Sequence, residues 1–371
     1  MKPVPKVTGE GEGAMAQPRR SYRTVDGLRG VGAFLVVMRH VPYFFGGVRV
    51  PESFLAVDLF YLVSGFVVAH AYGERLKAGG FAGRFFATRL IRLYPLYLLG
   101  LVLGLPIALL ATVTDPDGWW NWTRLAEAVG TGLFMIPFFP GLGANGSSLD
   151  GPTWTLLPEL VANMAYALAI RFMNIAVLSA IILICGAGVV FAEFRYGTLD
   201  VGFNPTDQWS ALARVGFSFF TGVLLFRVLD GRESRSEPIA WVCMAILALA
   251  LAFRPSEDLT PYFELGVVLI GFPALLVVAS RFEPGALSGR VFSFIGLISY
   301  GIYILHEPIG QIARLVLQSL GSFPEHPNGW LWGTGFLAVL TVLAWLADRR
   351  YDAPVRRALN ARFMSRPKQE K

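Results

Sequence analysis

The amino-acid sequence predicts an all-α polytopic membrane protein, with about ten transmembrane helices arranged around a central cavity. Of its 371 residues, 54% are hydrophobic and 16% are charged, and the mean hydropathy of +0.53 is too high for an ordinary soluble domain. Many windows of about 17 to 25 residues are nearly free of charge, which is the length that a helix needs to cross a bilayer. Basic residues gather in the gaps between these windows, as membrane topology requires.

Ten candidate spans follow from these apolar windows. They begin near Val31, Phe54, Leu90, Thr153, Asn174, Ser210, Pro238, Tyr262, Val291 and Leu331. A further apolar stretch, 125–141, is short and rich in glycine and proline. The two basic ends of the chain favour two cytoplasmic termini, and therefore an even number of crossings. We expect 125–141 to be a re-entrant or interfacial segment that lines a cavity on the outer side.

The two ends of the chain differ from the apolar region between them. Residues 1–22 lack the apolar core of a signal peptide and are predicted to form a disordered cytoplasmic tail. Residues 23–350 are predicted to form the membrane domain, and residues 351–371 a basic cytoplasmic tail on anionic lipid. The net charge of +6 does not indicate nucleic-acid binding, because the basic residues occupy the positions that topology requires.

The first span carries ionisable residues that are costly in hydrocarbon. Arg29 and His40 are eleven residues apart, close to three helical turns, so they share one stripe and lie about 16 Å apart along the axis. This stripe suits a ligand with an anionic head and a long arm, which is the shape of a coenzyme A thioester. Arg29 would hold phosphate, and His40 would act as a general base on a hydroxyl. In the plainer alternative, Arg29 only marks the cytoplasmic flank and His40 only packs between helices.

Polar residues of the second and third spans are candidate partners for this stripe. Asp58 lies in the outer half of the second span and could orient an imidazole or pair with Arg39. The dipeptide Ser64–Gly65, near the middle of that span, more simply allows close helix contact. Arg89 and Arg92 lie one turn apart at the inner edge of the third span. They could fork onto a diphosphate or a 3′-phosphate, or only mark the cytoplasmic side.

The stretch "PTWTLLPEL" adds three polar residues, Trp154, Thr155 and Glu159. Its prolines interrupt regular helix, and Glu159 falls several residues into the membrane. A carboxylate at that depth needs a partner, such as Arg39 or a substrate hydroxyl.

The stretch "ISYGIYILHEP" near the end of the chain also carries polar residues. Tyr300 and Tyr303 are most simply packing aromatics, whereas His306 and the adjacent Glu307 could line the acceptor side. The four histidines of the chain are scattered without ligand spacing, so no metal site is predicted.

Five segments together resemble a known family. "VDGLRGVGAFLVVMRH", "VDLFYLVSGF", "RLIRLYP", "TWTLLPE" and "ISYGIYILH" occur in the order and at the rough spacing of acyltransferase family 3. These integral-membrane enzymes O-acylate bacterial polysaccharides, lipopolysaccharide, peptidoglycan and some small molecules. The resemblance implies acyl-CoA binding by Arg29, Arg89 and Arg92 and a catalytic role for His40. The family's Trp-Ser-Leu-x-x-Glu pattern falls on Trp154 to Glu159, with Thr155 in place of serine.

The sequence therefore predicts a multi-pass O-acyltransferase of the bacterial inner membrane. An acyl group, with acetyl the leading expectation, would pass from cytoplasmic acyl-CoA to a hydroxyl of a saccharide, glycan or glycolipid at the periplasmic side. His40 is the expected base, oriented by Asp58 or Glu159. The expected acceptor-side or supporting residues are Trp154, Thr155, Ser64, Tyr300, Tyr303 and His306. Acetyl-CoA is a co-substrate, no cofactor is permanently bound, and the partners are membrane lipids and a possible second copy of the chain.

Three alternatives remain open at this point. His40 could form a covalent acyl-histidine instead of acting as a base. The ionisable residues within the membrane could instead form the pathway of a transporter for a saccharide or an organic anion. The chain could also accept an acyl group for a partner enzyme.

Overall fold

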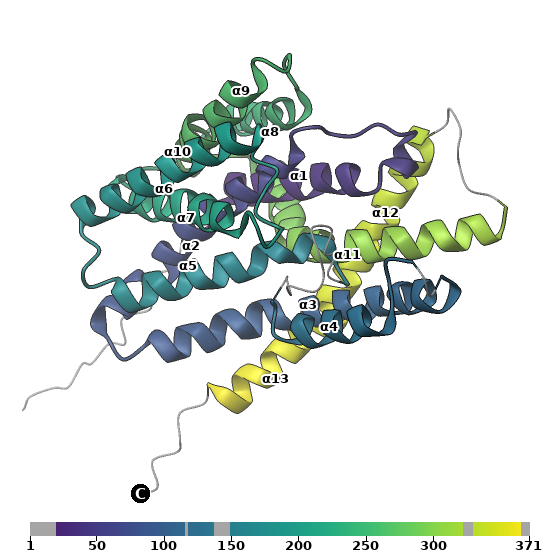
Figure 1. Cartoon of the computed structure of the whole chain (residues 1–371). Coiled ribbons are helices and arrows are strands. Elements are labelled where there is room, and N and C mark those ends of the chain that lie inside the picture. Colours follow the sequence, from purple (N-terminus) through teal and green to yellow (C-terminus); the bar gives the residue numbers. More distant parts are fainter. Residues whose placement is uncertain (1–19, 116–117, 137–148, 322–328, 365–371) are drawn as a thin grey trace, which may run out of the picture.

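The computed structural model describes residues 20–115, 118–136, 149–321 and 329–364, and these are almost entirely helical (Figure 1). The α-helices are α1 (Arg23–His40), α2 (Ala56–Ala78), α3 (Ala82–Thr114), α4 (Trp122–Leu133), α5 (Leu156–Ala169), α6 (Ile175–Tyr196), α7 (Gln208–Val228), α8 (Glu237–Ala252), α9 (Thr260–Gly266), α10 (Phe272–Arg281), α11 (Ala286–Ser319), α12 (Gly329–Ala347) and α13 (Ala353–Phe363). The short helical turns are η1 (Pro42–Phe45), η2 (Ser53–Leu55), η4 (Gly151–Thr155), η5 (Val267–Gly271) and η6 (Asp348–Asp352).

The predicted all-α membrane fold is confirmed, whereas the predicted count of ten crossings is not. Seven helical segments of the described residues are long and apolar enough to cross a bilayer, namely Ser53–Ala78, Ala82–Thr114, Ile175–Tyr196, Gln208–Val228, Thr260–Arg281, Ala286–Ser319 and Gly329–Phe363. The other three predicted spans correspond to α1, α5 and α8. Helix α1 has 18 residues but carries four charges, and α5 and α8 have only 14 and 16 residues. The ten crossings and the two cytoplasmic termini therefore stay predictions.

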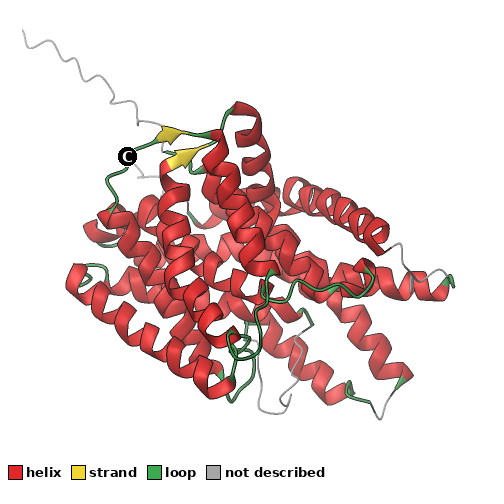
Figure 2. Cartoon of the chain, turned by 90° about the horizontal axis from the view of Figure 1, so that it is seen from above, coloured by secondary structure: helices red, strands yellow, loops and turns green. Residues whose placement is uncertain are grey.

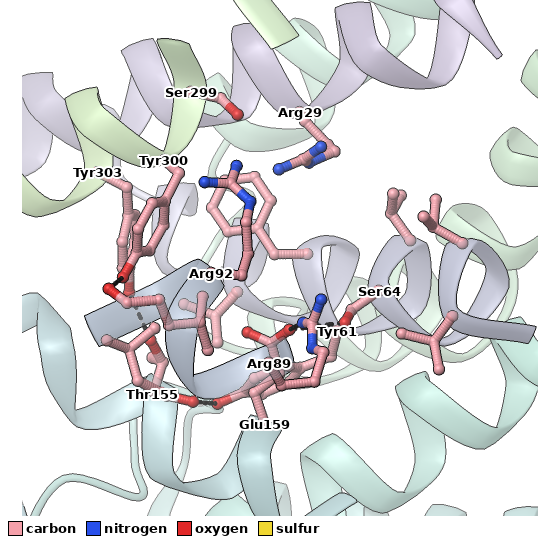
Figure 3. Close-up of a pocket in the computed structure, with 17 residues that line it drawn as sticks. Arg29, Tyr61, Ser64, Arg89, Arg92, Thr155, Glu159, Ser299, Tyr300 and Tyr303 are labelled. Atoms are coloured by element: carbon pink, nitrogen blue, oxygen red, sulfur yellow. Dashed lines mark hydrogen bonds and ion pairs between the residues drawn. The ribbon is translucent and has the colours of Figure 1, made fainter. Parts of the chain in front are cut away.

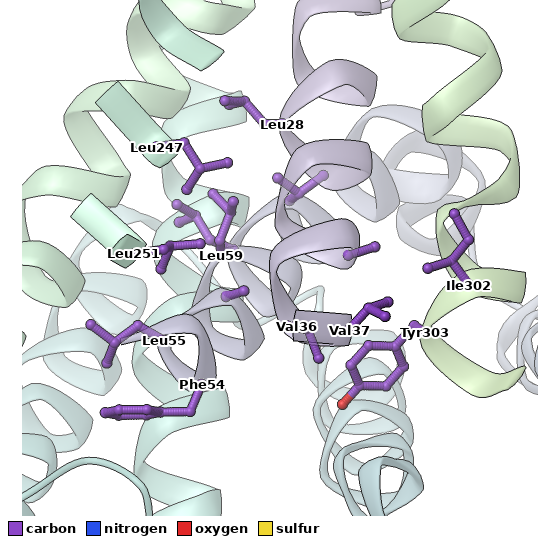
Figure 4. Packing of buried hydrophobic residues seen from close by; sticks show 14 of the residues in the cluster. Leu28, Val36, Val37, Phe54, Leu55, Leu59, Leu247, Leu251, Ile302 and Tyr303 are labelled. Atoms are coloured by element: carbon purple, nitrogen blue, oxygen red, sulfur yellow. The ribbon is translucent and has the colours of Figure 1, made fainter. Parts of the chain in front are cut away.

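Helix α1 lies inside the bundle, in contact with α2, α8, α10 and α11. Its buried side chains Leu28, Val36 and Val37 pack with leucines of α2 and α8 and with Ile302 of α11 (Figure 4). Burial of this kind explains how a helix with four charges can occupy the interior. Its apolar stripe faces neighbouring helices, whereas Arg29 lines a cavity and Arg39 pairs with Asp200.

Helices α1 and α11 run parallel and approach closely. A Cβ atom added to Gly27 would lie 2.9 Å from Cγ of Phe292, so glycine permits the contact near the start of α1. At the other end, Val41 packs against Gly310. Parallel packing brings the end of α1 beside the residues near 306 of α11, which the sequence alone does not reveal.

Two short strands at one edge of the helical bundle anchor the start of α1 (Figure 2). Strand β1 (Ser234–Arg235) pairs in parallel with β2 (Phe282–Glu283). The hydroxyl of Thr24 donates to the carbonyl of Phe282 at 2.6 Å, and the backbone N–H of Arg23 donates to Glu283 at 3.0 Å. These contacts fix the first turn of α1 against β2.

The predicted terminal and re-entrant segments are described only in part. Residues 1–19, 137–141 and 365–371 lie outside the described residues. Of the stretch 125–141, most belongs to α4, which hydrogen-bonds to α3 through Tyr97 Oη and the Gly132 carbonyl at 2.7 Å. Helix α12 continues through η6 into α13, which contacts α3.

Helices α2 and α7 meet at glycines, which confirms the close contact expected at Gly65. A Cβ atom there would overlap the carbonyl oxygen of Phe219. We expect Gly65→Val to lower the free energy of unfolding in detergent by about 1–3 kcal/mol, because an overpacked helix contact must separate. The control is Gly83→Val, since a Cβ atom at that position has no neighbour within 4 Å. Equal losses in the two variants would show that the α2–α7 contact is not close.

Candidate functional site

A cavity of about 210 Å³ lies between α1, α2, α3, α5 and α11 (Figure 3). Its polar lining consists of three arginines, one carboxylate, and hydroxyl groups from α2, η4 and α11. These residues are Arg29, Arg89, Arg92, Glu159, Ser64, Thr155, Ser299, Tyr61, Tyr300 and Tyr303. Eight of the predicted site residues are among them, so the structure brings together polar groups from segments that are far apart in the sequence.

Arg29 and Arg92 supply the weakly paired positive charge of the cavity. The nearest carboxylate to Arg29 is Asp26 at 3.9 Å, and the nearest to Arg92 is Asp352 at 3.5 Å. Both arginine side chains are 31% exposed. Their guanidinium groups can therefore hydrogen-bond an anion that enters the cavity, and a phosphate or a carboxylate matches the arginine fork.

Arg89 pairs with a carboxylate inside the cavity. Its Nη2 donates to Glu159 at 2.6 Å, and the hydroxyl of Ser64 donates to the same carboxylate oxygen at 2.6 Å. Of the two partners expected for Glu159, Arg39 or a substrate hydroxyl, Arg39 instead pairs with Asp200. Both arginines line the cavity, but they differ in pairing. Arg89 is bound to Glu159 at 2.6 Å, whereas Arg92 lies 3.5 Å from its nearest carboxylate, Asp352.

The turn that precedes Glu159 is held by two tyrosines. Tyr303 Oη donates to the Pro152 carbonyl at 2.8 Å and lies 3.0 Å from Thr155 Oγ1. Tyr61 Oη donates to the Thr155 carbonyl at 3.1 Å. Tyr303 therefore combines the packing that the sequence suggested with a hydrogen bond, as does Tyr300, whose hydroxyl donates to the Leu93 carbonyl at 2.7 Å. Tyr61 of α2 and Tyr303 of α11 together hold η4 against their helices.

Tyr61 is a cavity residue that the sequence analysis missed. It precedes Ser64 by three residues on α2, and residues three apart share a helix face. That spacing could have identified Tyr61 as a cavity residue. In an apolar segment, however, a tyrosine looks the same in sequence whether it packs or lines a cavity.

Asp58 lies outside the cavity, on another face of α2. Its carboxylate accepts from Arg214 Nη2 at 2.6 Å and from Arg214 Nε at 3.2 Å, and both side chains are almost fully buried. The expected contact of Asp58 with His40 or Arg39 is not found, because Arg214 on α7 occupies the carboxylate. Trp154 also faces away from the cavity, with its ring 6.0 Å from the Arg214 guanidinium.

His40 and His306 form a pair at the end of α1 opposite to Arg29. Their ring centroids are 5.0 Å apart, His40 is exposed, and His306 is fully buried. Each Nδ1 lies near a carbonyl of its own helix: His40 near Val36 at 3.0 Å, and His306 near Ile302 at 3.1 Å. A carbonyl oxygen only accepts, so each Nδ1 carries a hydrogen, and in a neutral ring the Nε2 is then the acceptor.

Tyr303 borders both the cavity and the histidine pair. Its ring lines the cavity, packs edge to face against Phe60 at 5.7 Å, and lies 6.2 Å from the ring of His306. Along α1, Arg29 therefore lines the cavity, and His40 at the end of the helix contacts His306 on the other side of Tyr303.

A buried carboxyl lies near the same end of α11. Asp150, immediately before η4, is fully buried, and burial followed by the negative charge of Glu307 raises the pKa of its carboxyl well above the ordinary value. The neutral form of Asp150 is therefore favoured.

Among the described residues, no group of three or more His, Cys, Asp or Glu side chains is arranged to hold a metal ion.

The chain is similar in sequence to proteins that are named as membrane acyltransferases. A family model described as an acyltransferase domain, Acyl_transf_3, matches residues 22–349. Protein 2 in the picA locus of Rhizobium radiobacter is 43% identical over 166 residues, which cover 40% of this chain and 83% of that protein. No solved structure matches the chain.

Two more distant relatives match most of the chain. A protein of Komagataeibacter xylinus, provisionally named membrane-bound transacylase BcsY, is 25% identical over 323 residues, or 81% of this chain and 76% of that protein. The peptidoglycan O-acetyltransferase OatA of Listeria monocytogenes is 20% identical over 372 residues, or 91% of this chain but only 56% of that protein.

Proposed function

The chain belongs to the acyltransferase-domain family that matches residues 22–349, and on this premise we propose that it moves an acetyl group from cytoplasmic acetyl-CoA to a saccharide hydroxyl at the periplasmic side of a bacterial inner membrane. One observation carries the proposal. An arginine-lined cavity borders α1 at Arg29, and His40, whose Nδ1 lies 3.0 Å from the Val36 carbonyl, ends the same helix.

The charge of the cavity supports coenzyme A as the donor. Arg29 and Arg92 would bind its phosphates, and Arg89 would contact the donor while it holds Glu159. The pantetheine arm would then extend along α1 toward His40, over an eleven-residue separation of about 16 Å. An arm of this length carries the thioester from the phosphate-binding end to the base.

The proposed reaction is a direct transfer. His40 Nε2 accepts the proton of the acceptor hydroxyl as the hydroxyl oxygen attacks the thioester carbonyl carbon. The carbon–sulfur bond breaks, and the protonated His40 returns the proton to the departing thiolate. Glu159 and Asp58 do not contact His40, so they contribute by holding α3, α5 and α7 against α2.

A covalent route through acyl-histidine would use the same lone pair. His40 Nε2 would attack the thioester first, and the acceptor hydroxyl would then take the acyl group. Purified protein mixed with [¹⁴C]acetyl-CoA and no acceptor distinguishes the two routes. Direct transfer leaves the protein unlabelled after rapid denaturation. The covalent route labels the wild-type protein but not His40→Ala.

Relatives support a saccharide as the acceptor. The Listeria relative is named for O-acetylation of peptidoglycan, which is a glycan. That relative is nearly twice as long as the matched region, so the acceptor class is carried to this chain as a proposal. A transporter is disfavoured, since the matching family is one of acyltransferases.

We expect Arg29→Ala and Arg92→Ala to raise KM for acetyl-CoA by about 10- to 100-fold, the loss that follows removal of one charge-assisted hydrogen bond. The turnover number should change much less, since neither guanidinium reaches the thioester. Radiolabel transfer at varied acetyl-CoA concentration measures both constants. Arg84→Ala is the matched control, because Arg84 is an exposed arginine on α3 that does not line the cavity. Unchanged KM in both cavity variants would contradict the donor assignment.

A further inference from the structure

The buried ring of His306 has one nitrogen that the fold leaves without a partner. Its side chain is fully buried, and its Nδ1–H is committed to the Ile302 carbonyl. No described residue hydrogen-bonds to its Nε2. Buried polar atoms are normally hydrogen-bonded, because an unpaired one costs about 1–3 kcal/mol. The unpaired acceptor therefore indicates a site that a donor from outside the chain completes.

A neutral His40 cannot be that donor. Its own Nδ1–H is committed to the Val36 carbonyl, so the Nε2 of the neutral ring is also an acceptor. Two acceptors cannot hydrogen-bond to each other, although the two rings are in contact with centroids 5.0 Å apart. The two rings in contact therefore offer two acceptor nitrogens, of which the one on His306 is buried and unpaired. A single hydroxyl has one hydrogen and satisfies only one of the two nitrogens.

We propose that the acceptor carries two hydroxyls on adjacent carbons, and that His306 Nε2 binds the one that is not acylated. This inference rests on the proposed function, in which His40 Nε2 accepts the proton of the reacting hydroxyl. The neighbouring hydroxyl keeps its hydrogen and donates it to His306, so no covalent change occurs there. Neighbouring hydroxyls of a sugar ring are close enough to meet two imidazoles in contact.

The role of His306 in this arrangement is to select and orient the acceptor. Its burial holds the ring in place, and the Ile302 carbonyl holds its tautomer. An alcohol without the second hydroxyl leaves the buried nitrogen unpaired, and a site built around a hydrogen bond discriminates strongly against such an analogue. The chain would therefore acylate vicinal diols in preference to isolated hydroxyls.

The test compares cis-cyclohexane-1,2-diol with cyclohexanol as acceptors of [¹⁴C]acetyl from acetyl-CoA. We expect the wild-type protein to favour the diol by about 10-fold in kcat/KM, and His306→Met to lose that preference through a larger fall in kcat/KM on the diol than on cyclohexanol. His306→Gln retains an acceptor oxygen and should keep part of the preference. Unchanged KM for acetyl-CoA shows that each variant is folded.

Three results would overturn the proposal. They are equal use of the two alcohols by the wild type, acylation of cyclohexanol but not of the diol by the wild type, and an equal loss on both alcohols in His306→Met. Failure of the proposed function has a different signature, since the wild type would then transfer no label to either alcohol.

Discussion

His40→Ala is expected to lose acyl transfer by a factor of about 10²–10⁴, because general-base catalysis by a positioned histidine contributes this much. The donor should still bind, since the arginines that face the cavity lie at the opposite end of α1. Initial rates with saturating [¹⁴C]acetyl-CoA and a saccharide acceptor measure the loss, and equilibrium binding of acetyl-CoA shows that the donor site is intact.

His70→Ala is the matched control for this experiment. His70 is on α2, near Arg20 and the start of α1, and its ring packs against Tyr22 and Phe226. It does not line the cavity, so this variant should keep full activity. Full activity in His40→Ala, or an equal loss in the two variants, would exclude His40 as the base.

Asp58→Ala is expected to destabilise the fold by about 3–5 kcal/mol, the cost of leaving a buried charge without its partner. The variant leaves Arg214, which is 1% exposed, without its carboxylate. The double variant Asp58→Leu/Arg214→Met should recover most of this loss, because two apolar side chains replace the buried pair. Thermal unfolding in detergent measures both effects.

Activity measurements then separate a structural role of Asp58 from a catalytic one. The double variant lacks the carboxylate but should retain acyl transfer at temperatures where it is folded. A double variant that is as stable as the wild type and yet inactive would show that Asp58 takes part in the reaction.

Relations within one helix could be predicted from the sequence, because helical periodicity fixes them. Periodicity puts Arg29 and His40 on one stripe of a helix, and in the structure both lie on α1, Arg29 at the cavity and His40 beside His306. Arg89 and Arg92 were placed one turn apart, and both line the cavity. The apolar windows likewise gave the positions of the helices, since hydrocarbon excludes charge over the length of a span.

Relations between helices could not be predicted in the same way. The partner of Asp58 is 156 residues away on α7, and the partner of Glu159 is 70 residues away on α3. Pairing depends on the rotation and order of the helices, which a single sequence leaves open. The contact of His40 with His306 depends on the parallel packing of α1 and α11. The hydrogen bond of Tyr303 could not be predicted for a similar reason. Its hydroxyl donates to the backbone carbonyl of Pro152, and the pattern of side chains in a sequence does not show which backbone carbonyls lie nearby.

The most direct test of the account is transfer across a sealed membrane. Proteoliposomes of known protein orientation would enclose [¹⁴C]acetyl-CoA on the cytoplasmic side, with bacterial saccharides on the other side. We predict acetyl label on the outer saccharides with the wild type, little with His40→Ala, and undiminished label with His70→Ala. Movement of saccharide across the membrane while the label remains on coenzyme A would contradict the account.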